Sequence, residues 1–115
     1  MMKVYEESLE EGGVSLSGRL IKLENACIGL FDEEGSIRLG TLAVAMPEFG
    51  GKHHISSVLL GDRNVMEAKL LAERVSAAMG GIVLVSIHLE PLAGLGSLVP
   101  LMKLALKLVE KSKKD

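Results

Sequence analysis

The chain has 115 residues, of which 48% are hydrophobic and 24% charged, and its formal net charge is -2. A balance this close to neutral exerts no overall attraction on nucleic acid or anionic lipid. With two Phe, one Tyr and no Trp, the chain also lacks the aromatic platform on which single-stranded nucleic acid stacks. We therefore expect one soluble domain over residues 1–115, with an aliphatic core and no nucleic-acid partner.

The single cysteine, Cys27, excludes an internal disulfide and any zinc site built on several cysteines. Its apolar surroundings, ACIGLF, predict a buried and reduced thiol. The first residues, MMKVYEESLEE, turn acidic at once and lack the apolar core of a signal peptide. The uncharged run from Val75 to Leu89 is shorter than the roughly 18 residues that a membrane span needs. We expect a cytoplasmic protein with no membrane association.

Five segments in the first half of the chain have the composition or the alternation of β-strands. They lie at residues 2–7, 14–20, 26–31, 37–46 and 55–60. The alternation slips at Leu20-Ile21, which predicts a bulge or a strong twist there. The turn sequence DEEGS separates the third and fourth segments by hairpin distance, so we expect these two strands to be neighbours.

The second half alternates helix and strand. Asn64, with Glu67 three positions later, predicts a capping box at a helix start. Gly80-Gly81 predicts the end of that helix, because glycine tolerates the left-handed cap conformation. Residues 82–89 then predict a strand, and a last helix begins near Ser97 and Pro100. The first helix has an apolar stripe of Ala68, Leu71, Ala72, Val75 and Met79. The order β-β-β-β-β-α-β-α predicts a predominantly antiparallel α+β domain.

The last helix has an apolar arc wider than one sheet face usually needs. Its core stripe is flanked by a polar line of lysines, and Leu104 and Leu106 fall between the two. We interpret Leu104 and Leu106 as candidate contacts with a protein partner. The alternative is a helix that fits into a groove of its own domain.

Charge is distributed unevenly along the chain. Residues 1–34 contain eight acidic and three basic residues, whereas Lys103, Lys107, Lys111 and Lys114 form a line on the last helix. This asymmetry either steers a protein partner or belongs to two ordinary surfaces.

The residues that carry chemistry elsewhere lack their usual context here. Gly94-x-Gly96 precedes no βαβ unit, so we predict no dinucleotide and no other cofactor. His53 and His54 are adjacent on an extended segment and point to opposite sides, so we predict no metal centre with His88. We predict no catalytic residue and no enzyme activity. The Gly61-Asp62 corner, which resembles a catalytic loop in outline, is interpreted as scaffold.

The loop MPEFGGKHH is a candidate contact with a client protein. Phe49 is one of three aromatics and lies among Pro47 and two glycines, and we take Glu48 and Lys52 as its polar rim. An aromatic on such a loop often anchors an interface. The alternative is that Phe49 folds back and plugs one end of the core.

The sequence resembles the proteasome assembly chaperone 4 family. The resemblance lies in LAVAM at 42–46, SSVLLGD at 56–62 and LAERVSAAMGGIVLVSIHL at 71–89, and it extends roughly from Val14 to the C-terminus. It implies a small β-sandwich or sheet of about six antiparallel strands flanked by two α-helices. It further implies a non-enzymatic chaperone, with no cofactor, that forms a homodimer or a heterodimer with a related chaperone. The implied clients are proteasome α-subunits during α-ring formation.

A second class of function fits the same composition: a small dimeric scaffold of the roadblock or longin kind that regulates GTPases or trafficking. The series LAVAM, LLGD and LAER favours the chaperone.

Overall fold

A computed structural model describes residues 2–47, 54–90 and 98–115. Six strands and two helices lie within these ranges: β1 (Lys3–Glu11), β2 (Val14–Lys22), β3 (Ala26–Glu33), β4 (Thr41–Pro47), β5 (His54–Leu60), α1 (Val65–Met79), β6 (Ile82–His88) and α2 (Leu98–Lys113). Neither helix is long and apolar enough to cross a membrane. The predicted α+β class, with about six strands flanked by two helices, is confirmed.

The strands form a single sheet in the order β1-β2-β3-β6-β4-β5. All neighbouring strands are antiparallel except β3 and β6, which run parallel. The predicted pairing of the third and fourth strands is wrong, because β6 lies between β3 and β4. Strand β6 has only aliphatic residues on its inner face and carries Ile82 and Leu84 on the other face, and such apolar strands are favoured at central positions of a sheet.

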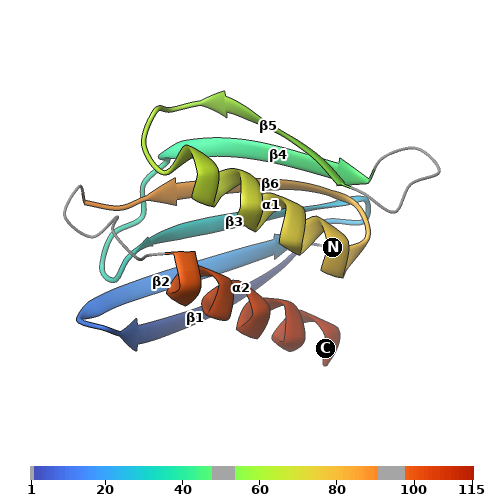
Figure 1. Ribbon diagram of the computed structural model, residues 1–115. Coiled ribbons are helices and arrows are strands. Elements are labelled where there is room, and N and C mark those ends of the chain that lie inside the picture. Colours follow the sequence, from blue (N-terminus) through green and yellow to red (C-terminus); the bar gives the residue numbers. More distant parts are fainter. Residues whose placement is uncertain (1, 48–53, 91–97) are drawn as a thin grey trace.

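Both helices cover the same face of the sheet, which we call the inner face (Figure 1). Helix α1 packs on β4, β5 and β6, and α2 packs on β1 and β2 and against α1. Because side chains alternate along a strand, every second residue of β2, β3, β4 and β6 joins the core beneath the helices. These residues include Leu16, Leu20, Cys27, Phe31, Ala43, Ala45, Val83, Val85 and Ile87.

Helix α1 buries Ala68, Leu71, Ala72 and Val75 of the predicted stripe, and Met79 is partly buried against the core. The helix ends at Gly80 in the left-handed conformation, as expected. The predicted capping box is wrong. Asn64 is itself left-handed, with φ 57°, and its side chain makes no cap hydrogen bond. Its amide nitrogen lies 3.4 Å from a carboxylate oxygen of Glu67 instead. Asn64 is therefore the N-cap residue by position, but its side chain does not cap the helix.

Of the two alternatives predicted at Leu20-Ile21, a bulge or a strong twist, the bulge is wrong. Strand β2 pairs without a register shift with both β1 and β3, so Leu20 faces the core and Ile21 faces the opposite side. The two apolar residues are adjacent because both faces of the sheet are apolar at this point. A register shift occurs instead between β4 and β5, at Leu42/Ala43.

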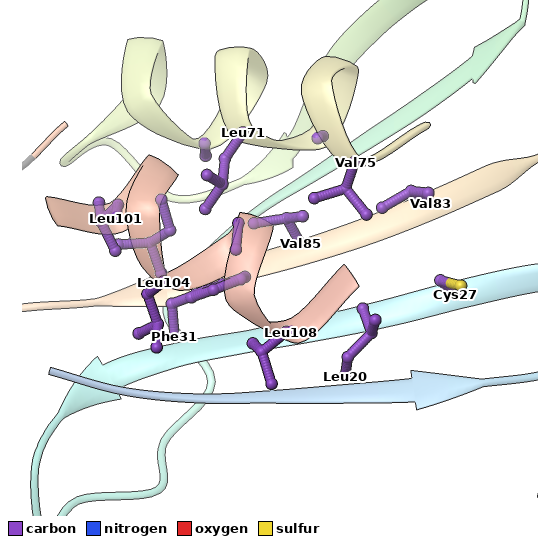
Figure 2. Close-up of a cluster of buried hydrophobic side chains, with 14 of the residues drawn as sticks. Leu20, Cys27, Phe31, Leu71, Val75, Val83, Val85, Leu101, Leu104 and Leu108 are labelled. Atoms are coloured by element: carbon purple, nitrogen blue, oxygen red, sulfur yellow. The ribbon is translucent and has the colours of Figure 1, made fainter. Parts of the chain in front are cut away.

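The core between α2 and the sheet is close-packed. Leu104 and Leu108 point from α2 toward the sheet, near Phe31 and Leu20 (Figure 2). A Cβ atom at Gly18 would lie 2.9 Å from Leu108 and 3.1 Å from Leu104, so glycine lets α2 approach β2. Cys27 is buried as predicted, and burial raises the pKa of its thiol.

The Gly61-Asp62 corner joins β5 to α1 and packs against the start of β4. Gly61 has φ 100°, and a Cβ atom there would lie 2.5 Å from Oγ1 of Thr41. The Thr41 hydroxyl donates a hydrogen bond to the backbone carbonyl of Arg63, which fixes the corner against β4. Glycine is therefore required here both by the backbone conformation and by the close approach of β4.

We predict that Gly61→Ala lowers the free energy of unfolding by about 3 kcal/mol or more, from backbone strain and steric overlap together. Gly35→Ala is the matched control, because Gly35 has φ 89° but open space around its Cβ position. The control should lose only about 1 kcal/mol. Urea denaturation measures both losses, and equal losses would contradict the role assigned to Thr41.

Candidate protein-binding surfaces

The face of the sheet opposite the helices, which we call the outer face, is apolar over a wide area. One row of paired residues crosses five strands from β1 to β4 and contains only aliphatic side chains: Val4, Ile21, Ile28, Leu84 and Val44. Met46 and Ile55, which pair with each other beside this row, are 43% and 51% exposed. No element of the described chain packs on this apolar row.

Soluble monomers rarely leave a continuous apolar patch of this kind in water. The pattern differs from that of a sheet with one solvated face, which alternates apolar and polar residues. The outer face is therefore the surface best suited to bind another protein. The outer face is hard to recognise in the sequence, because its residues come from five strands whose order depends on long-range packing.

The outer face becomes polar toward the end where β3 finishes. Asp32 is fully buried there, and its Oδ1 accepts a hydrogen bond of 3.1 Å from the backbone N–H of Arg38. Ser86 is also fully buried and accepts one of 2.9 Å from the backbone N–H of Gly40. The segment that leads into β4 thus lies over this end of the sheet.

Two buried polar atoms at this end have no partner within the described chain: Oδ2 of Asp32 and Nη1 of Arg19. Burial raises the pKa of Asp32, although the Arg38 N–H and the charges of His88, Arg19 and Arg38 oppose the rise. An unpaired buried polar atom costs stability, so this end of the sheet is less stable than a fully paired one.

The predicted binding residues fall into three groups. Glu48, Phe49 and Lys52 lie outside the described residues. Leu104 is a residue of α2 and is fully buried. This fits the alternative that the helix occupies a groove of its own domain. Leu106 is 36% exposed on α2 and is accessible to a partner. Binding through Leu106 stays a prediction.

The lysine line of α2 lies against the acidic strand β1. Lys107 and Lys111 place their ammonium groups 3.7 and 3.0 Å from the carboxylate of Glu7, and Lys103 pairs with Glu11. The hydrogen bond from Lys111 holds the pKa of Glu7 below its ordinary value. The charge asymmetry of the sequence is therefore largely matched within the fold, and little of it is left to steer a partner.

The described residues contain no group of three or more His, Cys, Asp or Glu side chains that could hold a metal ion. His53 lies outside them, and His88 lies on β6 beside Asp32 of β3. A cavity of about 220 Å³ adjoins the Gly61-Asp62 corner and is lined by Arg63, Asn64 and His88 among others. It is smaller than the roughly 300–1,000 Å³ of typical ligand pockets.

Comparison with solved structures identifies the same fold in a protein of known role. A chain from a crystal structure described as a novel chaperone complex for yeast 20S proteasome assembly superposes with a TM-score of 0.78. The match covers 96% of each chain at 14% sequence identity. No protein-family profile matches the sequence, and no curated protein matches it. At this identity the likeness establishes the fold.

We predict that Asp32→Asn stabilises the protein at neutral pH. Asp32 has a raised pKa, so the native state binds its proton more tightly than the unfolded state does. Stability is then lost as the pH rises above 3.8, the ordinary value of this group. The amide removes the buried charge and keeps an oxygen for the Arg38 N–H.

Thermal unfolding from acidic to neutral pH tests this. The advantage of Asp32→Asn over the wild type should grow as the pH rises. Asp62→Asn, the same change at an exposed carboxylate, is the matched control. An advantage that stays constant, or that shrinks with rising pH, would contradict the assignment.

Proposed function

We propose that residues 1–115 form a non-enzymatic proteasome assembly chaperone that pairs with a second chain of the same fold and binds proteasome α-subunits during α-ring formation. Three observations support this: the resemblance of three sequence segments to one chaperone family, the fold shared with a proteasome assembly chaperone complex, and the uncovered apolar outer face. The outer face is the observation that carries the proposal.

The size of the outer face suits a dimer. Six strands about 4.8 Å apart span about 24 Å from the first to the last, and a strand such as β4, with 7 residues, is about 23 Å long. A pleated patch of this extent is of the same order as the about 800 Å² per partner that specific interfaces bury. A partner that covers the whole outer face, and not the aliphatic row alone, would therefore bury an area suited to stable association.

A second sheet is the partner that best matches this surface. The outer face is a pleated surface, and two such faces interdigitate about 10 Å apart in a β-sandwich. Two chains joined in this way would form the layers helix, sheet, sheet, helix. The pair is either a homodimer or a heterodimer with a related chain, as the family resemblance implies.

We predict that Val44→Lys separates the pair while leaving each chain folded. Val44 lies on the aliphatic row, between Leu84 and Ser57 of the neighbouring strands. A lysine there stays hydrated in a single chain but becomes an unpaired charge inside the sandwich, at a cost of about 3 kcal/mol. The dissociation constant should rise about 100-fold.

Sedimentation velocity measures the association, alone or with the related chain, and circular dichroism checks the fold. Met66→Lys is the control, because Met66 is an apolar, exposed residue on α1, away from the outer face. Association that survives Val44→Lys, or that Met66→Lys weakens equally, argues against pairing through the outer face.

The client is tested by capture from a cell extract. We expect the chain to retain α-type proteasome subunits, whereas recovery of GTPases or trafficking proteins would favour the scaffold alternative. If Phe49 anchors the client, Phe49→Ala should weaken α-subunit binding by about 2 kcal/mol or more at unchanged stability. If Phe49 instead plugs the core, the same change should cost about 3–5 kcal/mol of folding stability.

A further inference from the structure

Strand β5 forms one edge of the sheet and lacks the usual protection of an edge. It pairs with β4 on one side, and no described element pairs with its other side. Its sequence, HISSVLL, contains no charged residue and no proline. Natural sheets usually place charged residues or proline on exposed edges, because the unpaired backbone N–H and C=O groups of an edge recruit further strands.

The opposite edge, β1, shows what a protected edge looks like in the same molecule. Its sequence, KVYEESLEE, is rich in glutamate, and α2 lies over its inner face. Another strand beside β1 would place its side chains next to these carboxylates. The difference between the edges indicates that β5, and not β1, is available to pair.

The two faces of β5 are clearly distinguished. Ser56 lies opposite Ala45 of the core and donates a hydrogen bond from its hydroxyl to Glu73 of α1, so it faces inward. By alternation, Ile55 and Ser57 face outward, and Leu59 is the extra residue at the register shift between Val58 and Leu60. Ile55 and Leu59 are 51% and 55% exposed. The edge therefore presents two large aliphatic residues on either side of a small serine.

This order is self-complementary. When a strand pairs antiparallel with its own copy about a two-fold axis at Ser57, Ile55 lies opposite Leu59 of the copy and Leu59 opposite Ile55. On the inner side, Ser56 lies opposite Val58. Ile55 and Leu59 thus each meet an aliphatic residue, and no like charges face each other.

We propose that β5 pairs with β5 of a second copy of this chain, antiparallel and centred on Ser57, so that two sheets become one continuous sheet. The self-complementary register and the uncharged edge identify the occupant as a second copy. The β1 edge of another copy is a poorer occupant, since its glutamates would lie beside Ile55 and Leu59. The register shift between β4 and β5 falls at Leu59 of β5, because Ala43 pairs with Val58 and Leu42 with Leu60, so regular pairing along this edge ends there.

This edge contact goes beyond the proposed function and does not depend on it. Edge pairing satisfies backbone groups in the plane of the sheet, whereas chaperone pairing covers the outer face. A chain can make both contacts at once, and the two together would build assemblies larger than a dimer.

Cysteine cross-linking tests the register directly. In the proposed pairing, the two copies of residue 57 have Cα atoms about 4.5–5.5 Å apart, within the about 4.4–6.8 Å that a disulfide requires. Ser57→Cys should form a disulfide with itself under mild oxidation. Leu59→Cys, on the same strand, should not, because its two copies lie about 14 Å apart along the strand at about 3.4 Å per residue.

A mixture of Ile55→Cys and Leu59→Cys chains, in contrast, should cross-link to each other, since these positions are opposite. Native Cys27 can remain, because it is buried. Non-reducing electrophoresis with mass spectrometry of the linked peptides is the readout. We expect the Ser57→Cys homodimer to exceed that of Leu59→Cys about tenfold or more, given the geometric limit on disulfides.

The cross-link should persist when Ser57→Cys is combined with Val44→Lys. Two sheets stacked through their outer faces lie about 10 Å apart, too far for the disulfide, so this result separates edge pairing from face pairing. Equal cross-linking of Ser57→Cys and Leu59→Cys, or none at position 57, would overturn the proposal. Cross-linking of position 57 only to a different protein would assign the edge to that protein and overturn it as well.

Discussion

Both helices pack on one face of a sheet that is apolar on both faces, and the other properties of the molecule depend on this constraint. The inner face is covered within the chain by α1 and α2. The outer face carries an aliphatic row from Val4 to Val44 without a cover in the described chain. Apolar surface contributes about 25 cal/mol per Å² when it leaves water. Removing the outer face from water is therefore favourable, and this favours association with another chain.

The same arrangement explains why the charged residues contribute little to association. Helix α2 lies over β1 and β2, so its lysines meet the glutamates of β1, and Tyr5 donates a hydrogen bond of 2.7 Å to Asp115. These ion pairs are exposed and individually weak. They match opposite charges within one chain and leave the apolar outer face and the uncharged β5 edge as the distinctive surfaces.

The sequence predicted the elements better than their arrangement. The α1 stripe, its glycine end and the aliphatic strand β6 follow from local periodicity, and all are confirmed. The place of β6 between β3 and β4 did not follow, because a DEEGS turn suggests a hairpin and strand order depends on long-range packing. Adjacent Leu20 and Ile21 suggested a bulge, whereas they signal a sheet that is apolar on both faces. Leu104 looked surplus on the helix because the glycine at position 18, which admits it to the core, is remote in sequence.

Solvent exposure of individual methyl groups tests the central claim most directly. With a soluble paramagnetic agent, NMR relaxation of the Ile28 and Leu84 methyl groups reports whether the outer face is covered. Val85, which is buried in the core, is the reference for a protected methyl group, and Ile37, which is exposed in the described chain, is the reference for an accessible one. We predict that Ile28 and Leu84 become as protected as Val85 when the chain is paired, alone or with a related chain. Methyl groups that remain as accessible as those of Ile37 in every sample would contradict pairing through the outer face.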